Sequence, residues 1–325
     1  MSAIWYNYAM QKITIVGAGN VGAECARRSA EKELGDVVLI DVVEGLAQGK
    51  ALDMLQASAI EKYSSNIIGT NDYKDTANSD VVIITAGLAR KPGMSRDDLL
   101  MKNAEITKSI VEQIVKFSPN CTIIMVTNPL DVMTYLALKA SKFPKNRVLG
   151  MAALLDEARM ETFLRMASKA HPKDIKALVL GSHGDLMVPL ADLSKIKGES
   201  IADLLSKEQI EAIVERTKNG GAEIVALLKS GSAYYAPSAS AVAMAQAILK
   251  NEKKEITSAV LLEGEYGLKD VCLGVPCVLG KNGAEEIREI PLKPEDLSAL
   301  KKSAENVKEN IGKIENFCIK NQNKQ

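Results

Sequence analysis

Histidine is scarce in this chain, since His171 and His183 are the two histidines among 325 residues. The cysteines are also few and show no regular spacing, at positions Cys25, Cys121, Cys272, Cys277 and Cys318. Two histidines and such scattered thiols cannot supply the closely spaced ligands of a usual zinc site, so we predict no metal. An odd number of cysteines also favours free thiols over a disulfide framework. Free thiols predict a reducing compartment, the cytoplasm.

The sequence has no excess charge of either sign and no long apolar run. Lysine and arginine together number 41, as do aspartate and glutamate, so there is no basic field of the kind that binds nucleic acid. No stretch of about 18 or more apolar residues occurs, which predicts a protein without a membrane span. Residues 1–10 lack the basic start and long apolar core of a signal peptide, and we interpret them as a short N-terminal extension.

The first half of the chain alternates apolar runs with helical periods. β-Branched runs predict buried strands at residues 12–17, 37–41, 80–86 and 121–127. Helical spacing predicts helices at residues 20–33, 43–59, 97–117 and 130–142. This alternation is typical of parallel strands with helices on both faces. The sequence therefore predicts an α/β fold whose N-terminal domain, residues 11–150, is a doubly wound parallel sheet of the Rossmann type.

The pattern changes after residue 150. Helical periods recur at residues 154–167, 207–229 and 238–249, and alternating segments between glycines predict antiparallel strands at residues 257–263, 269–279 and 286–290. Residues 294–317 predict an amphipathic terminal helix. No linker rich in serine, proline or glycine separates the halves. We therefore predict a C-terminal α+β substrate domain, residues 151–325, packed against the first domain with the site between them.

A glycine-rich motif follows the first predicted strand and opens the first predicted helix, with the sequence Gly17-Ala18-Gly19-Asn20-Val21-Gly22. An acid, Asp41, ends the next strand about twenty residues farther on, which is the context of a dinucleotide-binding motif. The first glycine would permit the turn, the second would let a pyrophosphate approach the backbone, and the third would allow close packing. Asp41 would accept hydrogen bonds from the adenosine ribose and repel a 2′-phosphate. The motif therefore predicts NAD rather than NADP.

Polar residues end two other predicted strands, in the segments Thr85-Ala86-Gly87 and Val126-Thr127-Asn128-Pro129. Ligands of open α/β sheets bind beyond the carboxyl ends of the strands, so we expect both segments beside the cofactor. Asn128 would reach the nicotinamide end and a substrate oxygen. An Asn-Pro turn without any ligand explains Asn128 equally well on sequence grounds.

Charged or titratable residues that could bind a small anion or act on it occur in three segments. Arg90 and Arg96 flank a Pro-Gly turn in a predicted loop, and an arginine fork fits a carboxylate bidentately. Asp156 and Arg159 share one face of a predicted helix, although a surface ion pair is the usual meaning of that spacing. His183 lies between glycines after a buried strand predicted at residues 177–181. A lone histidine is most often structural, but histidine is also the side chain best suited to proton transfer near neutral pH.

Taken in this order and spacing, the motifs identify a family resemblance. Over about residues 11–320 the chain resembles the lactate/malate dehydrogenase superfamily, and within it the lactate-dehydrogenase-like malate dehydrogenases. The resemblance implies reversible hydride transfer between malate and NAD, giving oxaloacetate and NADH, as in the tricarboxylic acid cycle. It also implies a homodimer or homotetramer that acts on a small dicarboxylate.

The resemblance further implies roles for the charged residues. His183 would accept and donate the proton, and Asp156 would be the carboxylate that orients it. Arg159 would bind the C1 carboxylate of the substrate. Arg96 would polarise the reacting carbonyl, with Asn128 assisting.

Substrate choice depends on Arg90 in this resemblance, because Arg90 would hold the second carboxylate where lactate enzymes usually carry an uncharged glutamine. Asn103 and Val126 would line the NAD site. Two alternatives stay open: a dehydrogenase of lactate or another 2-hydroxy acid, and a non-catalytic NAD(H)-binding scaffold. An unpaired buried arginine disfavours a methyl-bearing substrate, and a scaffold has no need of the His183, Asp156, Arg159 and Arg96 set.

Overall fold

The computed structural model of the chain describes residues 11–88 and 94–322, with side chains described through residue 315. The N-terminal half contains the strands β1 (Lys12–Val16), β2 (Asp36–Ile40), β3 (Ile67–Thr70), β4 (Val81–Ile84), β5 (Thr122–Met125) and β6 (Val148–Gly150). Its helices are α1 (Asn20–Glu31), α2 (Leu46–Glu61), α3 (Arg96–Phe117) and α4 (Leu130–Ser141).

The C-terminal half mixes short strands with longer helices. Its helices are α5 (Ala153–Ser168), α6 (Ile201–Leu204), α7 (Lys207–Leu228), α8 (Tyr235–Leu249) and α9 (Pro294–Gln322). Its strands are β7 (Ile175–Lys176), β8 (Val179–Gly181), β9 (Met187–Pro189), β10 (Lys195–Ile196), β11 (Glu199–Ser200), β12 (Lys254–Glu263), β13 (Lys269–Gly280) and β14 (Gly283–Ile287). Short 3₁₀ helices are η1 (Tyr73–Thr76), η2 (Lys145–Arg147), η3 (Pro172–Asp174), η4 (Ala191–Leu193) and η5 (Glu265–Gly267).

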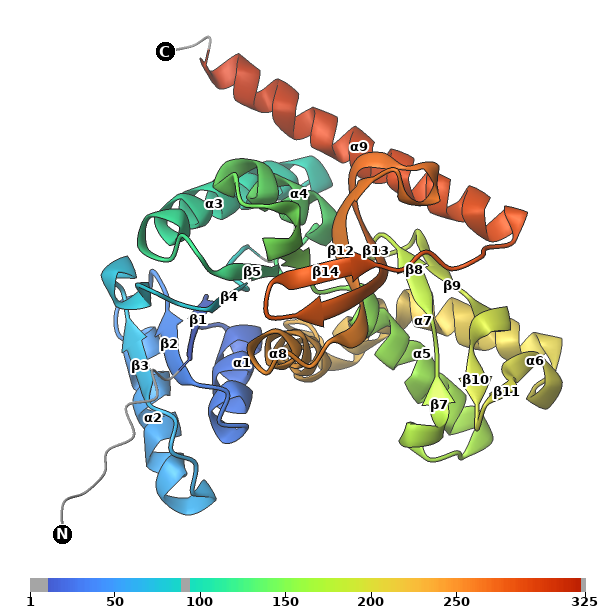
Figure 1. Cartoon of the computed structure of the whole chain (residues 1–325), viewed down its shortest axis with the longest axis horizontal. Coiled ribbons are helices and arrows are strands. Elements are labelled where there is room, and N and C mark those ends of the chain that lie inside the picture. The colour runs from blue at the N-terminus through green and yellow to red at the C-terminus, as the bar shows by residue number, and fades with distance from the viewer. Residues whose placement is uncertain (1–10, 89–93, 323–325) are drawn as a thin grey trace.

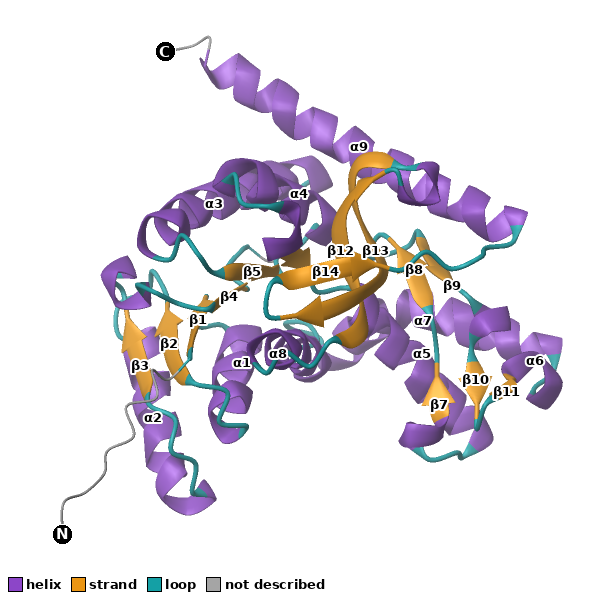
Figure 2. Ribbon diagram, in the orientation of Figure 1, coloured by secondary structure: helices purple, strands orange, loops and turns teal. Residues whose placement is uncertain are grey.

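One large mixed sheet runs through both halves (Figures 1 and 2). Within the described residues its strand order is β3-β2-β1-β4-β5-β6-β12-β13-β8-β9, with β14 paired to β13. The pairs from β3 to β6 are parallel, and the pairs from β6 onwards are antiparallel. The order 3-2-1-4-5-6 is that of a doubly wound dinucleotide-binding sheet. The predicted α/β fold class, with its parallel N-terminal sheet, is confirmed.

Helices cover the parallel strands on both faces, which explains why these strands are continuous apolar runs. Figure 1 shows α3 and α4 on one side of the sheet and α1 and α8 on the other. All four residues of β4 are fully buried as a result. The terminal helix α9 buries Leu300, Val307, Ile311 and Ile314 against α4, β13 and their neighbours, as its predicted amphipathic pattern requires.

The sheet is continuous across the predicted domain boundary. Gly150, the last residue of β6, pairs with Met125 of β5 on one side and with Ala259 of β12 on the other. No break in the sheet marks the predicted domain boundary at residue 150, so this boundary stays a prediction. In the described ranges, none of the helices has the length and apolar character needed to cross a lipid bilayer.

The predicted elements differ from the observed ones mainly at their ends. The helix predicted at residues 43–59 begins at Leu46 instead, because Gly45 adopts a left-handed φ of +79° just before it. The strand predicted at residues 286–290 is β14, which starts three residues earlier and pairs with β13 across a register shift. Strand β3 has no counterpart among the predicted elements, because its four residues include the exposed Ile68 and a glycine.

The buried apolar faces of the parallel strands should dominate stability. Leu39 in β2 has no exposed surface, so Leu39→Ala should lower the free energy of unfolding by roughly 2–5 kcal/mol. Leu204 at the end of α6 is 44% exposed. Leu204→Ala should therefore change the free energy of unfolding by less than about 1 kcal/mol. Urea unfolding curves of both variants measure the difference. Equal losses would show that burial in the sheet is not the dominant factor.

Candidate active site

The glycine-rich segment that follows β1 and runs into α1, called the glycine loop below, contains two glycines that the fold requires and one that it does not. A Cβ atom on Gly17, whose φ is +102°, would lie 2.8 Å from Ala86 N, and one on Gly22 would lie 1.7 Å from Gly17 O. A Cβ atom on Gly19 would meet nothing within 4 Å. Gly17 and Gly22 therefore allow the loop to pack, whereas the space beside Gly19 is open.

A cavity of about 660 Å³ lies next to this loop. Among the predicted cofactor residues it is lined by Gly17, Gly19, Asp41, Thr85, Ala86 and Gly87. Sequence reasoning missed most of the apolar wall, which includes Ile40, Val42, Val43, Leu46, Tyr73, Ile106 and Ile110. A large, mostly apolar cleft with a few polar groups at the carboxyl ends of parallel strands is typical of a cofactor site.

Asp41 joins the end of β2 to the glycine loop. Its carboxylate accepts hydrogen bonds from Ala18 N at 2.6 Å and from Val43 N at 2.9 Å. Asn71, which also lines the cavity, donates to the Asp41 carbonyl oxygen at 2.7 Å. The carboxylate thus faces the loop and the cavity together.

Asn103 ties together the segments that follow β4 and β5. Its side chain is buried, accepts from Leu88 N at 2.8 Å, and donates to the carbonyl oxygen of Asn128 at 2.8 Å. The hydroxyl of Thr127 donates to Ala86 O at 2.7 Å across the same gap. These bonds fix the strand ends at which a substrate and the nicotinamide are expected, and they leave the Asn128 side chain exposed.

The remaining predicted cofactor residues lie around the loop without lining the cavity. Ala18 is fully buried, Asn20 is exposed at the start of α1, and Val21 and Val126 are partly buried against the core. Their side chains can contribute packing, and their backbone groups border the loop and the end of β5.

His183, Asp156 and Arg159 form one buried cluster. Asp156, on α5, has a side chain only 2% exposed, and its two carboxylate oxygens contact different partners. One lies 2.9 Å from His183 Nδ1, and the other accepts from Arg159 Nη1 at 2.9 Å. Because the pair of Asp156 and Arg159 is buried, it is not the surface ion pair that its spacing alone would suggest.

Asp156 also sets the charge state of the imidazole. Burial disfavours the charged form of His183, but the negative charge of Asp156 and its hydrogen bond outweigh burial, so the pKa of His183 rises above its ordinary value of 6.5. The contact at Nδ1 leaves Nε2 as the ring nitrogen available to a substrate. A histidine of this kind can donate a proton at neutral pH.

Two glycines of α7 make room for the guanidinium of Arg159. A Cβ atom on Gly220 would lie 3.1 Å from Arg159 Cδ, and one on Gly221 would lie 3.3 Å from Arg159 Nη2. Within the described residues the buried Nε of Arg159 has no hydrogen-bond partner. Only part of the guanidinium is used by Asp156, so it retains donors for an anion. Sequence reasoning missed both glycines, although adjacent glycines inside a predicted helix were an available signal.

Two further residues that sequence reasoning missed hold the main chain around His183. Asp131, near the start of α4, accepts from His183 N at 2.8 Å. Ser303 of α9 accepts from Ser182 N at 2.8 Å and shares a second hydrogen bond with the Ser182 hydroxyl. Since Asp131 follows β5, the bond to His183 brings the imidazole to the carboxyl end of the parallel sheet.

The predicted arginine loop is only partly described. Arg90 lies outside the described residues. Arg96 is the first residue of α3, directly after Ser95, which caps that helix together with Asp98. The Arg96 side chain is exposed, and among the described residues it makes no hydrogen bond or ion pair with His183, Asp156 or Arg159.

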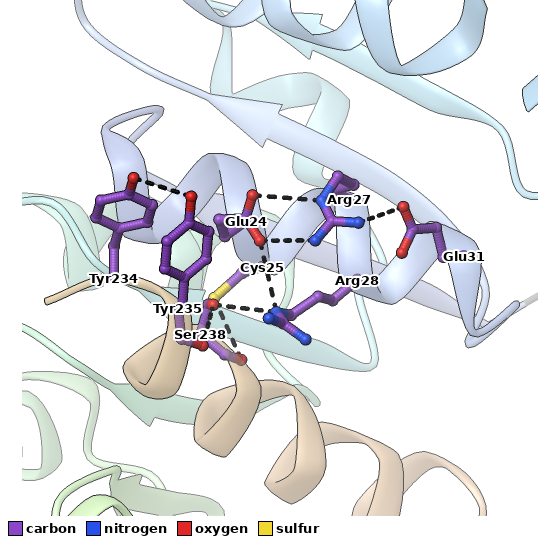
Figure 3. Close-up of polar contacts among 8 residues, drawn as sticks. All are labelled: Glu24, Cys25, Arg27, Arg28, Glu31, Tyr234, Tyr235 and Ser238. Carbon is purple, nitrogen blue, oxygen red and sulfur yellow. Dashed lines mark hydrogen bonds and ion pairs between the residues drawn. The ribbon is translucent and has the colours of Figure 1, made fainter. Parts of the chain in front are cut away.

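The two halves of the chain are also joined away from the site, through α1 and α8 (Figure 3). Arg28 on α1 donates to the hydroxyl of Ser238 on α8 at 3.2 Å, and it lies 3.6 Å from Glu24. Glu24 also pairs with Arg27 at 2.8 Å, and Arg27 pairs in turn with Glu31. The helix that carries the glycine loop is therefore braced by a helix from the other half.

Comparison with known proteins identifies the family. Residues 11–150 match the NAD binding domain of lactate/malate dehydrogenases, and residues 153–318 match their alpha/beta C-terminal domain. The chain belongs to the lactate/malate dehydrogenase family. This result confirms the predicted resemblance, the fold class and an NAD-dependent oxidoreductase.

Individual relatives are similar over nearly the whole chain. The malate dehydrogenase of Roseiflexus castenholzii is 53% identical over 93% of this chain and 98% of its own length. A solved malate dehydrogenase from Salinibacter ruber is 46% identical with a TM-score of 0.92, covering 96% of this chain and 100% of that one. A Cryptosporidium parvum lactate dehydrogenase, solved with lactic acid and nicotinamide adenine dinucleotide, is 39% identical with a TM-score of 0.92. The match covers 94% of this chain and 98% of that one.

The open space at Gly19 gives a sharp test of the cofactor site. Gly19 has an ordinary extended backbone at the N-cap of α1, so Gly19→Ala should lower the free energy of unfolding by no more than about 1 kcal/mol. Its methyl group should weaken NADH binding by roughly tenfold or more. Gly49→Ala is the matched control, because Gly49 also faces open space but lies in α2. It should keep NADH affinity. Unchanged NADH affinity in Gly19→Ala, measured by fluorescence titration, would mean that the cofactor does not approach this loop.

Proposed function

We propose that this chain is an NAD-dependent malate dehydrogenase, which transfers a hydride reversibly between malate and NAD. The observation that carries the proposal is the buried cluster of His183, Asp156 and Arg159, linked to the end of the parallel sheet through Asp131. It combines a proton carrier with an arginine that retains free donors. The high identity to relatives named malate dehydrogenase supports the same reaction.

The glycine loop and its cavity fit NAD. The open space beside Gly19 would admit the pyrophosphate, and Asp41 lines the cavity where it would accept hydrogen bonds from the ribose hydroxyls. Thr85, Ala86 and Gly87 would border the remainder of the cofactor. When bound, NAD supplies the hydride chemistry, and the protein supplies orientation and charge.

His183 would move the proton. In oxaloacetate reduction, protonated His183 would donate from Nε2 to the carbonyl oxygen of the substrate, and the neutral imidazole would stay bound to Asp156. In malate oxidation, neutral His183 would take the hydroxyl proton. Asp156 stabilises the charged imidazole in both directions, which is the role of a carboxylate behind a catalytic histidine.

Arginines would bind the two carboxylates of the substrate. Arg159 would pair the C1 carboxylate and Arg90 the second one, because a dianion needs both charges paired when a pocket excludes water. Arg96, with Asn128, would polarise the reacting carbonyl. Since lactate has a methyl group in place of the second carboxylate, Arg90 favours malate over lactate or another 2-hydroxy acid. The intact proton-transfer cluster disfavours a non-catalytic NAD(H)-binding scaffold.

We also propose that the chain forms a homodimer or homotetramer. Helix α2 exposes the large apolar side chains Leu52 and Ile60, which are 58% and 81% exposed, and Leu227 at the end of α7 is 75% exposed. An interface between copies of the chain would cover exposed apolar side chains such as these. Four described cysteines are buried free thiols, which supports a reducing compartment, the cytoplasm. There the reaction would serve the tricarboxylic acid cycle.

Substrate choice tests the proposed reaction and the role of Arg90. The wild-type protein should oxidise NADH rapidly with oxaloacetate, slowly with pyruvate, and not without substrate. Arg90→Gln should lower kcat/KM for oxaloacetate by roughly 10²–10³-fold, because a buried carboxylate loses its partner. Its rate with pyruvate should hold or rise. Arg96→Gln is the matched control and should slow both substrates. Equal losses on both substrates in Arg90→Gln would remove the support for malate.

The two histidines give a matched test of proton transfer. His183→Asn should lower kcat by at least about 10²-fold while NADH still binds, whereas His171→Asn, at an exposed position, should behave as wild type. Because the pKa of His183 is raised, oxaloacetate reduction should persist above pH 6.5 and fall as pH rises through that pKa. Malate oxidation should rise over the same range. Near-normal turnover of a folded His183→Asn would exclude His183 as the proton carrier.

A further inference from the structure

A second buried carboxyl group, that of Asp131, contacts the main chain of His183. Asp131 is the second residue of α4 and is 3% exposed. Its Oδ2 accepts from the main-chain N–H of His183 at 2.8 Å. Its Oδ1 is also buried and has no hydrogen-bond partner within the described residues. Burying a carboxyl with an unpaired oxygen lowers the stability of the fold. An asparagine or serine would accept one N–H hydrogen bond with a smaller loss of stability.

The charged and titratable groups around Asp131 determine which positive charge its carboxylate can stabilise. Burial raises the pKa of Asp131 to about 7, the hydrogen bond and charge of His183 lower it, and the charge of Asp156 raises it. The thiol of Cys272 on β13 also faces it, and burial raises the pKa of that thiol, so it stays neutral. The positive charge of Arg159 disfavours the imidazolium form of His183. The imidazole of His183 is therefore the positive group that Asp131 can stabilise.

We propose that Asp131 is a positioning residue for proton transfer, whose carboxylate fixes the main chain of His183 and favours the protonated imidazole while Asp156 fixes the ring. The inference rests on the proposed role of His183 as proton carrier. It states that two carboxylates, those of Asp156 and Asp131, act on this histidine. The effect is reciprocal, because a charge on His183 favours the ionised form of Asp131 and the ionised form favours that charge. The position in the first turn of α4 supports the ionised form as well.

Ser303 provides a matched, uncharged comparison. Its hydroxyl accepts from Ser182 N at 2.8 Å, so it holds the residue next to His183 from α9. Removing it disturbs the same loop through the loss of both hydrogen bonds to Ser182 but changes no charge. A merely structural role for Asp131 predicts that the two sites behave alike. A role in proton transfer predicts that only Asp131 moves the pH dependence.

The experiment compares Asp131→Asn, Asp131→Ala and Ser303→Ala in the full chain. Asp131→Asn keeps the shape and one acceptor for His183 N–H but removes the charge. It should move the fall in kcat/KM for oxaloacetate to lower pH by about 0.5–1 unit. In the cofactor-free protein, the imidazole titration of His183, followed by NMR, should move by the same amount. Asp131→Ala should also lower kcat by roughly tenfold or more, with KM and NADH affinity changing less.

Ser303→Ala should lower kcat modestly and leave the pH profile where it is in the wild type. The proposal is overturned if Asp131→Asn leaves both the pH profile and the imidazole titration unchanged, or if Ser303→Ala moves them equally. If Asp131→Ala fails to fold, the isosteric Asp131→Asn still decides the outcome. An inactive wild type would contradict the proposed function, whereas a shifted titration in Asp131→Asn would still show that the Asp131 carboxylate favours the protonated imidazole.

Discussion

The buried carboxylate of Asp156 is the interaction on which the candidate site depends. It contacts His183 through one oxygen and Arg159 through the other, both at 2.9 Å, and is almost completely shielded from water. A carboxylate in that position is stable only when both oxygens are paired, because an uncompensated buried charge costs several kcal/mol. One negative charge therefore holds His183, the proposed proton carrier, and Arg159, the proposed carboxylate-binding residue, in a fixed relative position.

The fold brings four elements together around Asp156 and His183. Asp156 and Arg159 come from α5, and His183 follows β8. Asp131 lies in the first turn of α4 after β5, and Gly220 of α7 leaves space for the guanidinium. The continuous sheet, in which β6 pairs with both β5 and β12, sets how the cofactor half and the substrate half meet. Asn103 and Thr127 then fix the ends of β4 and β5 beside them.

Sequence patterns predicted the parallel half of the fold well, because buried parallel strands are apolar on both faces and glycine-rich turns have few alternatives. They singled out Gly17, Asp41 and His183 as candidate site residues for the same reason, since each follows a strand. They could not reveal Asp131 or Ser303. The contacts of these residues with His183 and Ser182 span 52 and 121 residues of sequence, and an acid in the first turn of a helix ordinarily needs no explanation beyond the helix dipole. The burial of the Asp156–Arg159 pair also depended on tertiary packing, which spacing alone does not contain.

The central claim is that one carboxylate serves both proton transfer and substrate binding, and the kinetic constants of Asp156→Asn for oxaloacetate reduction test it most directly. If Asp156 organises both partners, the variant should show a kcat lowered by at least about 10²-fold and a KM raised by roughly tenfold or more, while NADH affinity stays close to that of the wild type. A fall in kcat with an unchanged KM would contradict the claim, because Arg159 would then bind the substrate without Asp156.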